Sequence, residues 1–161
     1  MAINIRSGLH TFPGYLYAGS IAINFDLPVF ADILSLYNPV GSGKVGHIIS
    51  GSLSARSDGQ ARVITANFNR GTKTLSGTVV TPSKLDSTSP ANVLQLNFGG
   101  TWSIGTRIES RALTCSPADN YDLTILSPIL LREGEGALFY IESESGAQVF
   151  LPSASLTWYE V

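Results

Sequence analysis

Apolar and polar residues alternate along most of this chain in short runs, and a period of two is typical of half-buried β-strands. The alternation is clean over Val93–Phe98 and over Ile104–Leu113. Thr72–Thr81 is rich in threonine and valine, whose branched side chains suit a pleated strand. About ten or eleven short strands are predicted, at roughly the 8–12-residue spacing of a β-sandwich or barrel. No helix longer than two turns is expected.

Glycine, proline, asparagine and aspartate mark the boundaries between these segments. Asp58-Gly59 predicts a tight hairpin turn between strands over Lys44–Arg56 and Ala61–Phe68. Thr81–Pro90 predicts the clearest loop, because five of its residues are serine or threonine, whose hydroxyls compete for backbone hydrogen bonds.

Two segments before residue 40 are less regular. Tyr15–Phe25 predicts a pair of strands, and Asp26-Leu-Pro28 interrupts them. Phe30–Tyr37 has apolar residues at a spacing that fits either a short helix or a buried strand, which periodicity cannot separate at this length. Asn38-Pro39 and a glycine cluster follow at once, so a strand is favoured.

Residues 1–14 lack helical periodicity and predict an extended N-terminal arm that ends in a turn at Pro13-Gly14. Ile3 and Ile5 are candidates for contact with the body of the protein or with a neighbouring subunit. A frayed terminus explains the composition equally well. Residues 15–161 form one predicted domain, and a chain of this size can bury about 70% of its unfolded surface.

The stretch Ser127–Glu142 combines two apolar runs with a charged, glycine-rich break. Ile129–Leu131 and Ala137–Ile141 predict two strands, and the glycines between them allow positive φ and a close return of the chain. A hairpin corner is therefore predicted, with charges exposed at its tip. Three charged tip residues are taken as candidate interface residues: Arg132, Glu133 and Glu135.

The whole pattern predicts an all-β chain, an antiparallel β-sandwich with jelly-roll topology, which limits exposed edges. Composition adds one fact, the scarcity of charge: 14% of the 161 residues are charged, against about 25% in ordinary soluble domains. Because surfaces are usually kept charged for solubility, we expect the chain to bury surface against copies of itself or a partner. A monomer with a serine-, threonine- and glycine-rich surface is the alternative.

Charge and hydropathy also exclude some partners. The formal net charge of −2 offers no basic footprint for nucleic acid. No apolar run approaches the ~20 residues of a membrane helix. Residues 1–30 lack a basic start followed by a continuous apolar core, so no signal peptide is predicted.

The residues that could carry chemistry do not form a recognisable site. Cys115 is the single cysteine, which excludes an intrachain disulfide, and we expect it to be buried. His10 and His47 have no partner at metal-ligand spacing. Gly41–Gly46 matches G-x-G-x-x-G, but a strand follows it, whereas dinucleotide binding needs a helix N-terminus. A flexible turn is predicted there, with no metal and no cofactor.

Four carboxylates late in the chain could pair as in a glycosidase: Glu133, Glu135, Glu142 and Glu144. Exposed charges are the rule, so a solvated rim, or salt bridges to Arg132 or to a neighbouring chain, is favoured. Residues 119–122 could be half of a calcium loop but lack the remaining oxygen ligands. No catalytic residue is predicted.

Trp158 and Tyr159 are adjacent aromatics in the last predicted strand, so they point to opposite faces. One is expected in the core, and the other could lie in a sheet or subunit interface. Trp158 is taken as a further interface candidate.

Four ordered blocks carry a resemblance to a known group of proteins. They are Leu36–Lys44 (LYNPVGSGK), Thr81–Ser87 (TPSKLDS), Pro128–Gly136 (PILLREGEG) and the ending Leu156–Glu160 (LTWYE). Their order resembles small jelly-roll virion proteins of tailed bacteriophages, over roughly residues 30 to 160. The resemblance implies a virion structural role without catalysis.

Within that group, a head decoration or cement protein fits the low charge and the arm best. Such a protein would be made in the host cytoplasm and sit on the capsid exterior, commonly as a homotrimer. It would hold the lattice of the major capsid protein together. A tail, baseplate or head-fibre receptor-binding module is the alternative, with Ser83–Ser89 and the Glu133–Glu135 tip contacting host glycans. A small jelly-roll enzyme is the third hypothesis, disfavoured because no triad, metal cluster or secure dyad is present.

Overall fold

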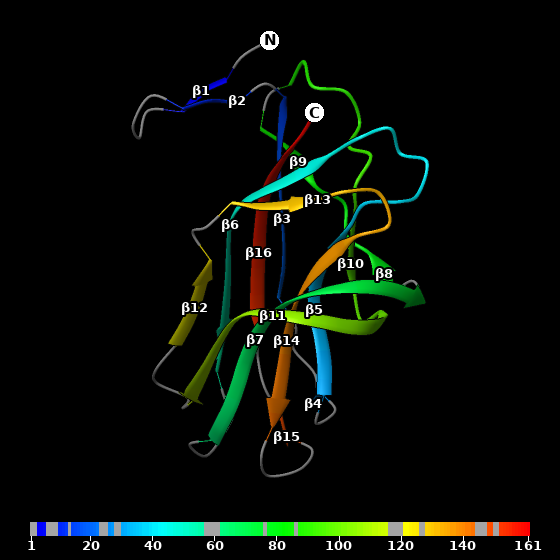
Figure 1. Ribbon diagram of the computed structural model, residues 1–161. Helices are drawn as coiled ribbons and strands as arrows, with labels where there is room; N and C mark the ends of the chain where they lie inside the picture. The colour runs from blue at the N-terminus through cyan, green and yellow to red at the C-terminus, as the bar shows by residue number, and fades with distance from the viewer. Residues whose placement is uncertain are drawn as a thin grey trace.

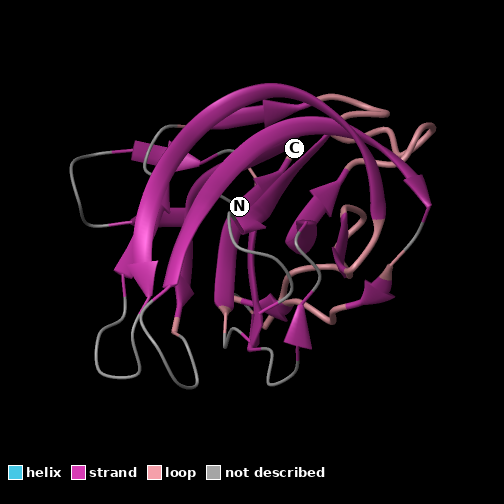
Figure 2. Cartoon of the chain, turned by 90° about the horizontal axis from the view of Figure 1, so that it is seen from below, coloured by secondary structure: helices cyan, strands magenta, loops and turns pink. Residues whose placement is uncertain are grey.

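The computed structural model describes residues 3–5, 10–12, 14–22, 26–27, 30–56, 62–75, 77–85, 87–115, 121–125, 128–143, 148–149 and 152–161. All regular structure in these ranges is β-strand (Figure 2). Most of the strands form two antiparallel sheets that pack face to face (Figure 1), and two pairs of short strands form separate two-stranded sheets. The predicted all-β sandwich is confirmed, and the described part of the chain contains no helix long and apolar enough to cross a membrane.

Eight strands, four in each sheet, give the sandwich its topology. The β5 sheet contains, in spatial order, β5 (Phe30–Tyr37), β14 (Gly136–Ser143), β7 (Arg62–Leu75) and β11 (Thr101–Cys115). The β3 sheet contains β3 (Tyr15–Ala22), β16 (Ser153–Glu160), β6 (Gly46–Ala55) and β12 (Tyr121–Ile125). Renumbered one to eight along the chain, these strands follow the orders 2-7-4-5 and 1-8-3-6. That alternation between sheets is the predicted jelly roll.

Shorter strands extend this frame. Between β7 and β11 the chain adds β8 (Thr78–Val79) and β10 (Gln95–Phe98) beside β5, and β9 (Ser83–Lys84) beside β3. β13 (Ile129–Leu131) pairs with β6, and β4 (Asp26–Leu27) pairs with β15 (Gln148–Val149). The described residues thus hold more strand segments than the ten or eleven predicted, because several segments span only two or three residues.

Both predicted hairpins are wrong as pairings. β6 and β7 lie in different sheets, so the chain crosses the sandwich near Asp58-Gly59, which itself lies outside the described residues. β13 pairs with β6 while β14 pairs with β5 and β7, so residues 132–135 form a corner between sheets. The physical reason is that successive jelly-roll strands must cover both sides of one core. Tyr15–Ala22 is one strand rather than the start of a pair, and Phe30–Tyr37 is a strand as favoured.

The N-terminal segment contains two short paired strands, β1 (Ile3–Ile5) and β2 (His10–Phe12). Ile3 lies opposite Phe12, and Ile5 lies opposite His10. Their side chains and the predicted turn residue Pro13 lie outside the described residues. Contact of Ile3 and Ile5 with a neighbouring subunit therefore stays a prediction.

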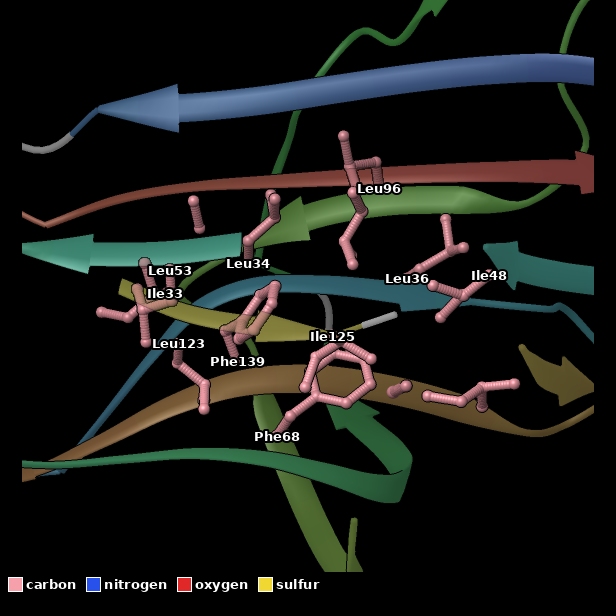
Figure 3. Packing of buried hydrophobic residues seen from close by; sticks show 14 of the residues in the cluster. Ile33, Leu34, Leu36, Ile48, Leu53, Phe68, Leu96, Leu123, Ile125 and Phe139 are labelled. Carbon is pink, nitrogen blue, oxygen red and sulfur yellow. The ribbon is translucent and has the colours of Figure 1, made fainter. Parts of the chain in front are cut away.

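The core lies between the two sheets, where alternate side chains of facing strands interdigitate (Figure 3). Phe68 on β7 packs against Phe139 on β14 with ring centroids 4.7 Å apart. Tyr17 on β3 and Trp158 on β16 stack at 5.8 Å. Fully burying large apolar side chains stabilises a fold by about 1.5–3 kcal/mol each. The side chain of Cys115 lies outside the described residues.

Candidate interaction surface at the loop end of the sandwich

Two loops far apart in sequence are joined at one end of the sandwich. The loop after β5 and the β13–β14 corner exchange backbone hydrogen bonds, Asn38 N to Glu135 O at 2.9 Å and Gly134 N to Asn38 O at 2.8 Å. The Asn38 side chain is buried and donates to Lys44 O at 2.8 Å and to Leu131 O at 3.1 Å. The asparagine therefore fixes the spacing between the two loops.

Glu133 closes the same junction from the other side. Its carboxylate accepts hydrogen bonds from Gly41 N at 3.0 Å and from Gly43 N at 2.8 Å. Both glycines have positive φ, 78° and 64°, and successive backbone N–H groups in such turns form a concave anion seat. The glycine cluster thus binds a carboxylate of its own chain.

Glu135 forms a salt bridge with Arg70, and not with the predicted Arg132 side chain. Its carboxylate accepts a hydrogen bond from Arg132 N at 2.8 Å and forms an ion pair with the guanidinium of Arg70 at 3.5 Å. Both side chains of the pair are partly exposed, so it contributes little stability. The tip therefore presents one exposed cation, Arg132, while both carboxylates are engaged within the chain.

The C-terminus and the long loop before β10 reach the same end. Val161 and Val45 exchange two backbone hydrogen bonds of 3.1 Å. Buried Glu160 accepts hydrogen bonds from Val93 N at 2.9 Å and from Leu94 N at 3.1 Å. Sequence reasoning missed Glu160, since nothing local distinguishes it from a solvated terminal acid.

Apolar side chains are exposed on these joined loops. Val40 is 78% exposed, Leu85 54%, Val93 36% and Val161 36%. Together with Arg132 they define what we call the loop-end surface: Val40, Leu85, Val93, Arg132 and Val161. The C-terminus, β9 and β13 mark this end at the top of Figure 1.

The remaining sequence candidates lie elsewhere. Trp158 is fully buried and has no surface available for a partner, because its side of β16 faces the core. Tyr159 is the partly exposed member of the pair, and its ring stacks on His47 at 4.4 Å. Burial raises the pKa of Tyr159 and lowers that of His47. Glu142 is partly exposed, whereas Glu144 and most of residues 119–122 lie outside the described residues.

One buried acid, Asp32 on β5, was also missed by the sequence analysis. Its Oδ2 accepts hydrogen bonds from Trp102 Nε1 at 2.9 Å and from Gly100 N at 3.2 Å. Burial raises the pKa of Asp32 to about 7, against the lowering effect of its hydrogen bonds and of Lys73. The only sequence signal was an aspartate inside an otherwise apolar strand.

Asp32 links separate parts of the fold. In the ranges described, no three histidine, cysteine or acidic side chains gather as metal ligands would. The donors on Asp32 come from β11 and from the turn before it, so the carboxylate ties that region to β5. This geometry suits a structural anchor.

Comparison with known proteins gives no family. No protein-family model matches the chain, and no curated protein matches it. Solved structures with some similarity include a pilus protein of Bacillus endospore appendages, with TM-score 0.38 and 11% identity over 98% of this chain and 97% of that chain. The infectious bursal disease virus Gx strain gives TM-score 0.42 and 13% identity over 99% of this chain and 36% of that chain. Empty heads of turnip yellow mosaic virus give TM-score 0.26 and 9% identity over 98% of this chain and 87% of that chain.

Proposed function

We propose that the chain is a non-enzymatic structural protein of a tailed-bacteriophage virion, a head decoration protein. It sits on the capsid exterior and binds the major capsid protein through the loop-end surface. One observation carries the proposal: the four blocks that resemble phage virion proteins meet at this end. Leu36–Lys44 and Pro128–Gly136 are joined through Glu133, and Leu156–Glu160 ends beside them.

The fourth block reaches the same region by backbone pairing. Leu85 N donates to Leu16 O at 3.1 Å, and Lys84 lies opposite Tyr17 on β3. The end of β16 near Glu160 also pairs with β3. A resemblance concentrated in one structural corner is what a shared docking surface would produce.

The physical character of the surface supports docking. Its loops are already fixed by hydrogen bonds between distant residues, so little conformational entropy is lost when a partner binds. Four exposed apolar side chains supply buried area, and Arg132 supplies a donor for an acidic group. The predicted homotrimer would place three such surfaces on the lattice.

A receptor-binding role on the tail, baseplate or head fibre is the second candidate. A shallow hollow beside the tip favours it, lined by polar groups that could bind a glycan: Arg70, Thr72, Ser103, Thr106 and Glu135. The tip acids weigh against it, because Glu133 and Glu135 already accept hydrogen bonds within the chain.

The test is binding of the purified chain to capsids that lack it, measured by co-sedimentation. We expect wild type to bind and Val40→Asp with Arg132→Glu to bind at least about tenfold more weakly, a loss of about 1.4 kcal/mol. Val63→Asp is the matched control, because Val63 on β7 is also exposed, at 42%. Wild type that fails to bind, or loop-end variants that bind as wild type does, would overturn the proposal. Binding to host cells instead would favour the second candidate.

A further inference from the structure

The edges of the β5 sheet are very unequal. On one side the sheet ends in β8, which spans two residues and offers little backbone to another strand. On the other side it ends in β11, which spans fifteen residues and, in the described part of the chain, pairs only with β7. Figure 2 shows β7 and β11 as two long neighbouring arcs. A long edge strand is a ready template for pairing with another chain.

The side chains of β11 leave this edge accessible. Thr101 and residues 103–107 are exposed, and so are Glu109 to Ala112. Ile104 is 44% exposed although it is large and apolar. In the β3 sheet the corresponding edge strand, β12, spans only five residues. β11 is therefore the longest open edge that the described strands provide.

The pairing of β11 with β7 divides the strand into two parts. Register shifts occur between Ile104 and Arg107 and again between Arg107 and Glu109, so this part is bulged. Bulges bend a strand and protect an edge from pairing. From Glu109 to Cys115 the register is regular, opposite Phe68 to Arg62. A partner strand would therefore be centred near the start of the regular part.

We propose that β11 pairs antiparallel with β11 of a second copy of this chain, about a two-fold axis at Ser110. The charges on the strand determine which residues of the two copies lie opposite each other. In this register Glu109 of each copy lies opposite Arg111 of the other, which gives two reciprocal ion pairs. Oppositely charged cross-strand pairs stabilise a sheet, and like charges directly opposite destabilise it.

Neighbouring registers fit less well. An axis at Glu109 would place Glu109 opposite its own copy and Arg107 opposite Arg111, so every charged pair would be repulsive. An axis at Ala112 would leave Glu109 and Arg111 opposite uncharged residues. An axis at Ile108 would pair Arg107 with Glu109, but it falls on the bulged part of the strand.

The side chains on the two faces of β11 are compatible with close approach. Glu109 and Arg111 share one face, since their β7 partners Phe68 and Ala66 alternate with Asn67. On the other face Ser110 would meet its own copy, and its hydroxyl donates to Asn67 Oδ1 at 2.7 Å. A guanidinium has five donors, so Arg111 can bind a carboxylate of the second copy in addition to other contacts.

This contact joins two β5 sheets into one continuous sheet. It uses a different surface from the loop end, so it does not depend on binding to a capsid. It is also compatible with a trimer built through other surfaces, because a two-fold contact can link one trimer to the next. Most of its free energy would come from backbone hydrogen bonds, since exposed ion pairs contribute little.

Disulfide trapping tests the contact and its register. In a Cys115→Ala background, Ser110→Cys would face its own copy across the axis, within the Cα separation that a disulfide spans. We expect mild oxidation to give a covalent dimer. Ile108→Cys and Ala112→Cys are matched controls on the same strand, each about 13 Å from its copy in this register. Cross-linking of a control in place of Ser110→Cys, or of all three alike, would overturn the proposal.

A charge exchange tests the same pairing without cysteine. Glu109→Arg would place arginine opposite Arg111, and we expect the wild-type cross-strand dimer to weaken by at least about tenfold in light scattering and sedimentation. Glu109→Arg with Arg111→Glu restores opposite charges, and we expect it to restore the dimer. A single variant that associates as wild type does would refute the charge-specified register. Far-UV circular dichroism checks that each variant folds.

Discussion

Glu160, Glu133 and Asp32 each accept hydrogen bonds from backbone N–H groups that lie far away in the sequence. Glu160 binds the amides of Val93 and Leu94, and Glu133 binds those of Gly41 and Gly43. The chain has twelve acidic residues, so these three are a quarter of its acidic side chains. These three acidic side chains hold distant segments of the chain together.

Glu160→Ala tests that use most directly. The substitution would leave the amides of Val93 and Leu94 and the indole N–H of Trp158 without their acceptor. A buried donor left unsatisfied costs about 1–3 kcal/mol, so we expect the free energy of unfolding in urea to fall by at least about 3 kcal/mol. Lys84→Ala, at an exposed position outside both proposed contact surfaces, serves as the control and should change it by less than about 0.5 kcal/mol. Equal effects of the two substitutions would contradict the anchoring role.

Asp32 makes stability depend on pH. Its carboxyl keeps its proton in the folded protein up to about pH 7, but loses it near pH 3.8 in the unfolded chain. Between these values the folded state binds more protons, so the free energy of unfolding falls as pH rises, by up to about 1.4 kcal/mol per pH unit. Above pH 7 this contribution is lost and the dependence on Asp32 ends.

Asp32→Asn removes the titration but keeps an oxygen acceptor for Trp102 and Gly100. We expect urea unfolding followed by tryptophan fluorescence at pH 5 and pH 8 to show a smaller loss of stability for the variant than for wild type. Glu142→Gln, at a partly exposed carboxylate outside the β11 contact, should leave the wild-type difference intact. The same pH difference in Asp32→Asn and wild type would show that Asp32 does not carry it.

These residue roles could not be predicted from the sequence, because each acid and its donors are far apart along the chain. Glu160 and Val93 are 67 residues apart, and no local pattern links them. The glycine cluster was correctly predicted as a turn that leads into a strand, β6. Its carboxylate partner, Glu133, was predicted to lie on a solvated rim or to form a salt bridge, because a sequence shows charge but not which distant amides approach it.

At the element scale, strands were predictable and their partners were not. The alternating stretch Val93–Phe98 contains β10, and Ile104–Leu113 lies within β11. Asp58-Gly59 nevertheless failed as a hairpin signal, because turn residues report where the chain bends and not which sheet it enters next. The jelly roll followed from strand number and edge protection, which are properties of the whole pattern.

The Trp102 side chain connects β11 to other strands of its own sheet. Its indole donates to Asp32 and packs over Gly136, where an added Cβ would collide with the ring. We expect Gly136→Ala to displace the ring and to lower the free energy of unfolding by about 1–3 kcal/mol. A red shift of tryptophan emission should accompany the loss.

A double-mutant cycle isolates this contact. In a Trp102→Ala background the ring is gone, so Gly136→Ala should cost much less than in wild type, and the two effects should be non-additive. Additive effects would mean that the alanine clashes with the backbone near Leu36 O, which an added Cβ would approach to 3.0 Å.

At the scale of the whole molecule, the low charge has a partial explanation in the outer face of the β3 sheet. Serines on β6 and β16 pair there across strands, Ser52 with Ser155 at 2.9 Å and Ser54 with Ser153 at 2.7 Å. Hydroxyls keep this face polar without charge, as the monomeric alternative supposed. Association is therefore supported by the β11 edge and the loop-end surface rather than by composition.

Pairing through β11 would make thermal stability depend on protein concentration, because a partner that binds only the folded chain shifts unfolding by mass action. We expect the thermal unfolding midpoint of wild type to rise over a hundredfold increase in protein concentration. The unfolding midpoint of Glu109→Arg should stay nearly constant. Val40→Asp with Arg132→Glu should behave as wild type, since the loop end is not part of this contact. An unfolding midpoint of wild type that does not depend on concentration would contradict the β11 contact. It would not bear on capsid binding, which has a separate test. Loss of the dependence only in the loop-end variant would instead assign self-association to the loop end.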